Sequence, residues 1–334
     1  MTDQPVRWGI VGTANIARGS FLPGLRAAGG TAAAVAGREL GRAEKWASEQ
    51  GVDRAIEGYQ ALIDDPGIDA LYIPLPNSLH AEWTIAALRA GKPVLCEKPL
   101  CGSLEEVQQV LAVAQETGTL LWEAFVFPFH DQFAAVRKLI SDGVIGELRE
   151  IQSNFAFTVG RPENIRMIRD LDGGALNDVG CYPVRLARDL FGAEHDAASA
   201  SAIWDPSGVD LETWGWLGFP GERRLLLSCG FRRAQDTFSR LMGTAGQIGI
   251  SNPFHPRAGD TFRLRVPGRD PVSYQGTGPD QHSFTPAVRH IQAVVAGRES
   301  PRWLAAGTSL GSARALADLA GHSRGGQSSG TATP

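Results

Sequence analysis

A short glycine turn near the N-terminus constrains the fold of this chain more than any other feature. The segment Gly9-Ile-Val-Gly12-Thr-Ala14-Asn-Ile-Ala17 follows an apolar run at residues 6–11 and precedes a helical pattern. Aligned on the pattern Gly-x-Gly-x-x-Gly, its three positions are Gly12, Ala14 and Ala17. Between a strand and a helix this pattern predicts a dinucleotide-binding turn, with a purely structural tight turn as the alternative.

Short apolar runs and helical patterns alternate from residue 6 to about residue 123. One of the helices opens with a capping box formed by Ser103 and Glu106. Strict alternation of strands and helices predicts a doubly wound parallel sheet with right-handed crossovers. The runs expected to form its strands are Val6–Val11, Thr31–Ala36, Asp69–Ile73, Pro93–Cys96 and Leu120–Glu123.

The pattern changes after about residue 145, where longer apolar runs are separated by Gly, Pro or Asp turns. Consecutive strands joined by short turns predict an antiparallel sheet. The expected strands are Leu148–Thr158, Ala197–Trp204, Leu211–Phe219, Arg223–Phe231, Thr237–Met242 and Phe262–Val266.

Helices interrupt and follow this second sheet. They are expected from about Asn177 to Phe191, over Pro286–Ala296 and over Ser309–Ala320. Residues 322–334 are mostly Gly, Ser and Thr without an apolar pattern, which predicts a flexible tail.

Composition narrows the class of protein. The chain has 334 residues, of which 43% are hydrophobic and 20% charged, as in a globular enzyme. A net charge of −4 without long charge runs argues against a nucleic-acid partner. No apolar stretch approaches the roughly 20 residues that span a bilayer, and no secretion signal is visible, so no membrane partner and a cytoplasmic location are expected. The four cysteines form no Cys-x-x-Cys pair, so no disulfide framework and no metal site are expected.

The end of the second expected strand bears on cofactor choice. In Ala36-Gly37-Arg38 a cation stands where an NAD-preferring site usually carries Asp or Glu for the ribose 2′-hydroxyl. Arg38 offers donors suited to a 2′-phosphate, and Arg42 lies one helical turn further on. These residues favour NADP(H), although NAD(H) stays possible, and two solvated surface arginines are the alternative.

A proline-rich segment, Ile73-Pro74-Leu-Pro-Asn77-Ser-Leu-His80, follows another expected strand. Open α/β sheets bind ligands at such strand ends, and two prolines with an asparagine make a fixed backbone shelf for a nicotinamide ribose. For His80, a capping or packing role is as reasonable as a role in the site. The expected cofactor-binding residues are Gly12, Thr13, Ala14, Asn15, Ile16, Arg38, Arg42, Pro74, Leu75, Pro76, Asn77, His80, Glu97 and Lys98.

Two further segments suggest proton transfer. Asp178 and Tyr182 are four residues apart on an expected helix and therefore share a face, and Lys98 lies in Glu97-Lys98-Pro99. A lysine, a phenol and a carboxylate at one place suit acid/base chemistry on a hydroxyl or carbonyl group. Three unrelated surface residues are the alternative reading.

The chain resembles the glucose–fructose oxidoreductase / inositol dehydrogenase (Gfo/Idh/MocA) family of nicotinamide-dependent oxidoreductases. The resemblance rests on residues 12–17, 74–80, 97–99, 173–183, 243–248 and 252–254, and so extends over most of the chain. Residues 123–130 and 178–183 resemble most the branch of dimeric dihydrodiol dehydrogenases and NADP-dependent xylose-type dehydrogenases.

The resemblance implies an N-terminal Rossmann domain at residues 1–123 and a C-terminal α+β domain at residues 124–321. The second domain carries a large, open, mostly antiparallel sheet through which members associate, so a homodimer or homotetramer is expected. The resemblance further implies that Lys98 and Tyr182 are acid/base residues with Asp178 beside them, and that the Lys98–Pro99 bond is cis.

The implied activity is hydride transfer between NADP(H) and a secondary hydroxyl, carbonyl or hemiacetal carbon of a sugar, cyclitol or cyclic diol. Aromatic and cationic residues near the implied substrate site are Phe127, Phe157, Arg161 and Arg166, together with Asp178 and Tyr182. Aromatic residues there suit stacking on a sugar ring, although alternating aromatics on strands more often belong to a core.

Three departures from the family pattern leave the substrate open. Asn177 fills an often apolar position, Asp172 stands where a third glycine is frequent, and Pro128 replaces a usual basic residue. Two other functions remain: an enzyme that uses tightly held nicotinamide in glycoside chemistry, and a noncatalytic NADP(H)-sensing regulator. Such regulators tend to lose the lysine and tyrosine that this chain keeps.

Overall fold

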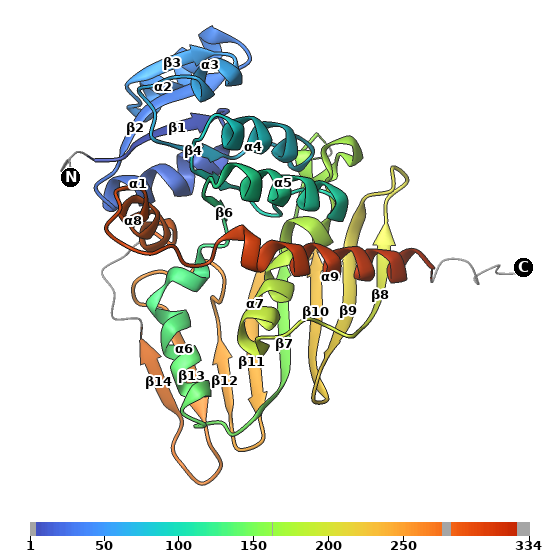
Figure 1. Cartoon of the computed structure of the whole chain (residues 1–334). Coiled ribbons are helices and arrows are strands. Elements are labelled where there is room, and N and C mark those ends of the chain that lie inside the picture. The colour runs from blue at the N-terminus through green and yellow to red at the C-terminus, as the bar shows by residue number, and fades with distance from the viewer. Residues whose placement is uncertain (1–4, 162, 276–281, 326–334) are drawn as a thin grey trace, which may run out of the picture. The chain divides into compact units, whose positions relative to one another are not determined.

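The computed structural model describes residues 5–161, 163–275 and 282–325. The chain divides into two compact units made of interleaved segments (Figure 1). Their bounds are Met1–His130, His255–Ala258 and Thr277–Leu310 for the first unit, and Asp131–Phe254, Gly259–Gly276 and Gly311–Pro334 for the second. No helix among the described residues is long and apolar enough to cross a membrane.

The first unit contains a six-stranded parallel sheet in the order β3-β2-β1-β4-β5-β6. The order reverses between β1 and β4, as in doubly wound dinucleotide-binding folds, so the predicted fold class is confirmed. The sequence did not predict β3, which is short and only half-buried and therefore lacks an apolar run. The strands are Arg7–Val11 (β1), Thr31–Gly37 (β2), Arg54–Glu57 (β3), Ala70–Ile73 (β4), Val94–Cys96 (β5) and Leu121–Glu123 (β6).

Helices connect these strands, and the predicted capping box is present in α5. The Ser103 side chain accepts a hydrogen bond from the Glu106 N–H, and the Glu106 carboxylate accepts one from the Ser103 N–H. The helices of this unit are Leu22–Ala27 (α1), Leu40–Gln50 (α2), Tyr59–Ile63 (α3), His80–Arg89 (α4), Leu104–Thr117 (α5) and Phe284–Val295 (α8).

The last of these helices, α8, comes from the C-terminal third of the chain. A Cβ on Gly24 of α1 would lie 2.6 Å from the Cβ of Phe284, so the two helices are in close contact. Phe284 also joins the buried aromatic cluster of Trp8, Phe21 and Tyr72. The first unit therefore includes residues that the sequence assigned to the second domain. The domains at residues 1–123 and 124–321 stay a prediction.

The second unit is built on an eight-stranded sheet in the order β14-β13-β12-β11-β7-β10-β9-β8. Every neighbouring pair is antiparallel except β7 with β10, which confirms the mostly antiparallel sheet. The sequence missed β12 and β14, which have four residues each. The strands are Leu148–Ala156 (β7), Ala197–Trp204 (β8), Asp210–Phe219 (β9), Arg223–Gly230 (β10), Asp236–Gly243 (β11), Gln247–Ile250 (β12), Thr261–Arg265 (β13) and Val272–Gln275 (β14).

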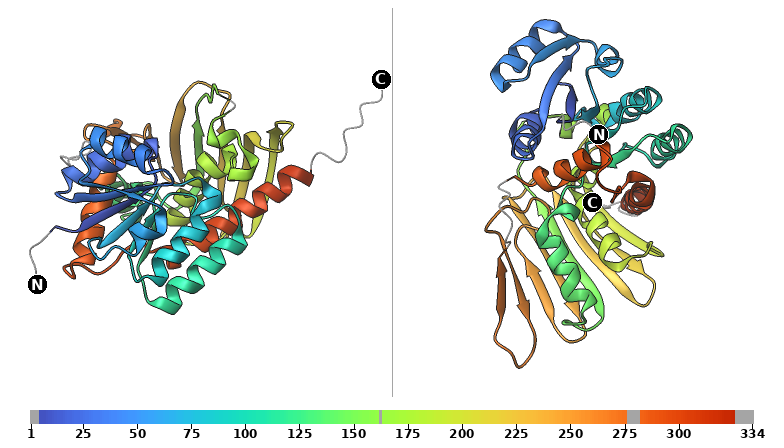
Figure 2. Two further views of the ribbon diagram at one scale, coloured as in Figure 1. Left: turned by 90° about the horizontal axis from the view of Figure 1, so that it is seen from above. Right: turned by 60° about the vertical axis from the view of Figure 1, so that its left-hand side comes forward.

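One face of this sheet packs against helices. Figures 1 and 2 show α6 (Asp131–Ser141) and α7 (Cys181–Phe191) on it. The helix α9 (Ala305–Gly325) lies on the same face, because a Cβ on Gly215 of β9 would lie 3.0 Å from Cδ2 of Leu319. Gly215 pairs with Leu227 of β10, which is buried on this face. The helix continues to residue 325, so the predicted tail does not begin at residue 322, and residues 326–334 lie outside the described part.

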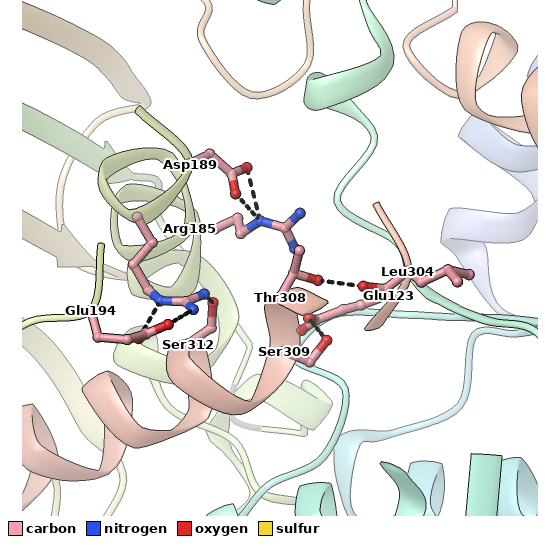
Figure 3. A network of polar contacts seen from close by, with 9 residues as sticks. Glu123, Arg185, Asp189, Glu194, Leu304, Thr308, Ser309 and Ser312 are labelled. Carbon is pink, nitrogen blue, oxygen red and sulfur yellow. Dashed lines mark hydrogen bonds and ion pairs between the residues drawn. The ribbon is translucent and has the colours of Figure 1, made fainter. Parts of the chain in front are cut away.

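Charged side chains fasten α7 within this unit (Figure 3). The guanidinium of Arg185 is 1% exposed and donates to the buried carboxylate of Asp189 one turn later. Arg188 donates to Glu194 and to the hydroxyl of Ser312 on α9. A buried charge needs such a partner, because an unpaired one costs several kcal/mol. The contacts of Arg188 connect α7, the helix that carries Tyr182, to α9 and to Glu194 beyond its C-terminal end.

Candidate functional site

The carboxyl ends of the parallel strands of the first unit lie along one edge of its sheet. Directly beyond these ends come Gly12 after β1, Arg38 after β2, Pro74 after β4 and Glu97 after β5. Ligands of open α/β sheets bind at this edge, next to the point where the strand order reverses. The residues predicted to bind a cofactor therefore share the expected edge.

Gly12 forms the turn after β1 in a conformation that favours glycine. Its φ is 99°, and its N–H donates to the carbonyl oxygen of Ala36 over 2.9 Å. A Cβ at this position would lie 2.9 Å from Cδ2 of Leu75. Positive φ and close packing together exclude ordinary side chains.

The residues after Gly12 leave main-chain groups near this edge. Thr13 and Ala14 are half-buried, and Asn15 and Ile16 are exposed. A π-helical turn, Ala17–Phe21, then continues directly into α1. The N-terminus of a helix after a turn without large side chains is suited to a pyrophosphate, so the residues present fit a dinucleotide.

The two arginines predicted to read the adenosine ribose are exposed. Arg38 follows the last residue of β2 directly, and Arg42 lies in the first turn of α2. Both side chains are therefore accessible at the strand end where a ribose 2′-substituent is recognised in this fold class.

His80 is fully buried and contacts the main chain of two segments. Its Nδ1 lies 2.9 Å from the Pro99 carbonyl oxygen, and its Nε2 lies 2.8 Å from that of Leu75. Burial lowers the pKa of the imidazole, and the charge of Lys98 acts in the same direction. A neutral ring can donate to one carbonyl only. These contacts correspond to the packing role that the sequence left open.

The Glu97-Lys98-Pro99 segment is held by buried polar contacts. The Lys98–Pro99 bond is cis, as the resemblance implied. One carboxylate oxygen of Glu97 accepts a 2.7 Å hydrogen bond from the Tyr72 hydroxyl, and the other accepts from the Lys98 N–H over 3.2 Å. Glu97 is buried and Lys98 half-buried.

Asp178 and Tyr182 lie in consecutive helical segments of the second unit. Asp178 belongs to a π-helical turn, Leu176–Gly180, which continues into α7 and Tyr182. The sequence predicted one regular helix here and did not foresee the π-turn, which often marks functional sites.

The surroundings of these two side chains differ. Tyr182 is 5% exposed, and its ring centroid lies 5.3 Å from that of Phe155 and 5.1 Å from that of Phe254. The carboxylate of Asp178 accepts a 2.6 Å hydrogen bond from Nε of Arg166. The second unit thus places an aromatic-packed phenol one helical turn beyond an arginine-bound carboxylate.

Arg166 also connects Asp178 with the aromatic residue that directly follows β7. Its guanidinium lies 5.6 Å from the ring centroid of Phe157, within range of a cation–π contact. Among the predicted substrate residues, Phe157, Arg166 and Asp178 therefore form one cluster. Arg161 of the second unit is exposed. Phe127 of the first unit is buried, and its ring centroid lies 6.2 Å from that of Phe125.

Asp210, which sequence reasoning missed, anchors the segment that carries Asp178. One of its carboxylate oxygens accepts 2.8 Å hydrogen bonds from the Leu176 N–H and the Thr213 hydroxyl. Gly174, with a φ of 127°, packs so closely on this carboxylate that a Cβ would clash. Burial raises the pKa of Asp210 to about 6. The sequence signal was weak, since a single aspartate at the start of a strand is usually solvated.

Among the described residues, no group of three or more His, Cys, Asp or Glu side chains is arranged to hold a metal ion.

The fold and the edge of the first sheet define a dinucleotide-binding oxidoreductase. Residues 6–125 match the oxidoreductase family with an NAD-binding Rossmann fold, and residues 133–249 match the GFO/IDH/MocA C-terminal domain. The chain belongs to the GFO/IDH/MocA family of oxidoreductases, as its resemblance indicated.

Two relatives show the range of this family. A dTDP-3,4-didehydro-2,6-dideoxy-alpha-D-glucose 3-reductase of Streptomyces violaceoruber is 40% identical over 79% of this chain and 78% of its own length. A D-xylose 1-dehydrogenase (NADP(+)) of Haloferax volcanii is 34% identical over 78% of this chain and 81% of its own. The second belongs to the branch named from the sequence, whereas keto-sugar nucleotide reductases were not foreseen.

A solved structure extends the likeness to nearly the whole chain. The 3-ketoreductase from Actinomadura kijaniata in complex with NADP and TDP-benzene has a TM-score of 0.86 and 31% identity. The match covers 95% of this chain and 97% of that protein.

Replacement of Asp210 by Asn should change how stability depends on pH. The folded-state pKa of about 6 exceeds the usual 3.8, so the folded protein holds this proton more tightly than the unfolded chain. Wild-type stability therefore falls as pH rises from about 4 to 6, by up to about 3 kcal/mol from this group. Asn keeps an oxygen acceptor and removes that dependence.

Urea unfolding of both proteins at pH 4, 5, 6 and 7 measures the difference. The stability of wild type relative to Asp210→Asn should fall as pH rises. Parallel curves would show that Asp210 has an ordinary pKa in the folded protein.

Proposed function

We propose that this chain transfers a hydride between NADP(H) and a secondary hydroxyl or carbonyl carbon of a sugar-like substrate. One observation carries the proposal: a dinucleotide-binding sheet edge with Arg38 occurs in a chain that keeps Lys98, Asp178 and Tyr182. The relatives support it, since their names describe keto-sugar reduction and xylose oxidation.

Different residues of the sheet edge bind different parts of the cofactor. Residues 12–16 bind the pyrophosphate, Arg38 and Arg42 bind the 2′-phosphate, and residues 74–77 hold the nicotinamide ribose beside Glu97 and Lys98. When bound, the nicotinamide supplies or accepts the hydride. The relatives named with NADP or solved with it support NADP(H) over NAD(H).

The chain's own side chains move the proton. In the oxidation direction Tyr182 accepts the hydroxyl proton of the substrate, and in reduction it returns that proton to the carbonyl oxygen. The Lys98 ammonium stabilises negative charge on the same oxygen. Asp178 orients Lys98 or a substrate hydroxyl, and its bond from Arg166 holds the carboxylate in one direction. Phe157, beneath the Arg166 guanidinium, contributes apolar surface.

Two rival functions make different demands. An enzyme with tightly held nicotinamide would retain its cofactor through purification, and a noncatalytic regulator would not need Lys98 or Tyr182. Retention of both residues favours the enzyme. The cytoplasmic location expected from the sequence stays a prediction.

We further propose that the second sheet mediates association of the chain into a homodimer or homotetramer. The face away from the helices carries large exposed apolar side chains on neighbouring strands, and Trp216 pairs with Leu226 across β9 and β10. Exposed apolar patches of this kind usually mark interfaces. The exposed residues are Ile203, Trp214, Trp216, Leu226 and Phe238.

Replacement of Arg38 by Asp should weaken NADPH binding about 10- to 100-fold, because charge-assisted hydrogen bonds to the 2′-phosphate are lost. NADH binding should change little or improve. Titration followed by tryptophan and nicotinamide fluorescence gives both dissociation constants. Arg89→Asp is the control, since this exposed arginine lies at the C-terminal end of α4 and should leave both constants unchanged. Equal wild-type affinities would overturn the preference for NADP(H).

Replacement of Tyr182 by Phe should lower kcat about 10²- to 10⁴-fold, the usual contribution of a positioned acid/base group. NADPH affinity should stay within about twofold, because the ring contacts with Phe155 and Phe254 remain. Tyr274→Phe on β14 is the control and should keep wild-type turnover.

The assay for this pair screens aldoses, inositols, trans-dihydrodiols and dTDP-linked keto-sugars with NADP(H). Turnover of free sugars alone, or of nucleotide-linked sugars alone, decides between the two substrate types of the relatives. Unchanged turnover of Tyr182→Phe would remove this residue from the mechanism.

Replacement of Trp216 by Arg should reduce the oligomer to a 35.7 kDa monomer, because it places a charge in the proposed interface. Val272→Arg is the matched control. Val272 is 46% exposed, and its register partner Leu264 is buried, so it lies on the opposite face of the sheet. Light scattering after size-exclusion chromatography measures both masses, and a monomeric wild type would refute the proposal.

A further inference from the structure

One peptide group next to Lys98 is held at both of its polar atoms by buried side chains. The carbonyl oxygen of Pro99 lies 2.9 Å from Nδ1 of His80, and the N–H of Leu100 donates to Glu123 over 2.8 Å. His80 is fully buried and Glu123 is 6% exposed. This peptide group is therefore fixed from two sides within the first unit.

Glu123 is itself held in one orientation. Its other carboxylate oxygen accepts a 2.6 Å hydrogen bond from the hydroxyl of Ser309, which is 2% exposed on α9 (Figure 3). In the sheet, Glu123 pairs with Cys96, the last residue of β5 before Glu97 and Lys98. A buried carboxylate with both oxygens engaged cannot turn without breaking a hydrogen bond, and an orphaned buried group is costly.

We propose that Glu123, oriented by Ser309, is a positioning residue for Lys98. It contacts the main chain two residues beyond Lys98 and acts on the reaction through the placement of the ammonium group. This inference rests on the proposed function, in which Lys98 stabilises the reacting oxygen. Accurate placement matters because a displacement of about 1 Å can cost roughly 100-fold in rate.

An amide can make the same two hydrogen bonds as the Glu123 carboxylate, so we expect Glu123→Gln to keep the Lys98 segment in place. In Glu123→Gln the amide oxygen still accepts from the Leu100 N–H, and the amide NH₂ donates to the Ser309 hydroxyl. This variant should keep kcat within about threefold of wild type. Glu123→Ala removes both contacts and should lower kcat about 10- to 100-fold, with the KM for NADPH nearly unchanged. An equal loss in the Gln variant would overturn the positioning role.

A double-mutant cycle with Lys98→Met separates positioning from general damage. If Glu123 acts through Lys98, Glu123→Ala should reduce kcat less than about twofold further once Lys98 is absent. Ser323→Ala is the matched control, because it removes a buried hydroxyl from the same helix at a position where it donates to the carbonyl oxygen of Ala320. This control should be nearly neutral on both backgrounds. A full, additive loss from Glu123→Ala would refute the inference.

The same experiment distinguishes failure of the inference from failure of the proposed function. Unchanged kcat in Lys98→Met alone would refute the proposed role of Lys98, whatever Glu123 does. If Glu123→Ala fails to fold, as judged by thermal unfolding, Ser309→Ala takes its place. That variant leaves the Leu100 contact but frees the carboxylate, so a smaller loss of kcat that vanishes in Lys98→Met supports the inference. A loss that persists there refutes it.

Discussion

The loops at the carboxyl edge of the parallel sheet depend on one constraint: buried main-chain polar groups need partners. Strand pairing ends at this edge, so side chains take over. Glu123 accepts from the Leu100 N–H, and His80 lies against the Leu75 and Pro99 carbonyl oxygens. These side chains bind the main chain of residues 74–77 and of the segment that carries Lys98. A requirement of folding therefore also determines the positions of the proposed functional groups.

The same rule operates in the second unit on a different element. Asp210 accepts from the Leu176 N–H at the start of the π-helical turn, and Gly174 leaves room for that carboxylate. Arg166 then orients Asp178. In both units the residues proposed to act on substrate are flanked by buried carboxylates that bind main chain, so each unit holds its own proposed functional groups in place before any ligand binds.

The sequence predicted the architecture because its signal is periodic and local. Alternating strand and helix patterns identified the parallel sheet, and turn-separated strands identified the antiparallel one. The missed strands β3, β12 and β14 are not continuously buried, whereas β5 and β6, with three residues each, are buried throughout and therefore show as apolar runs. The packing of α8 on α1 depends on contacts between residues about 260 positions apart, such as Gly24 and Phe284, and no local pattern encodes it.

Prediction of the site followed the same division between local and nonlocal signals. Gly12 and the cis bond at Lys98 were accessible from motif and resemblance. The anchoring roles of Glu123 and Asp210 were not, because a single carboxylate reveals its partners only in the folded structure. His80 illustrates the limit, since its motif position suggested the cofactor and its two ring contacts are with main-chain carbonyls.

The three departures from the family pattern fit the local backbone of this chain. Asp172 stands where a third glycine is frequent and has a φ of 54°, so it keeps the left-handed conformation that glycine adopts easily. Pro128 lies in a 3₁₀ turn that accepts proline near its start, and Asn177 is a half-buried member of the π-turn. At these positions the backbone conformation suits the new side chain. Side chains near the proposed substrate site can therefore differ from the family pattern without a strained backbone at these positions.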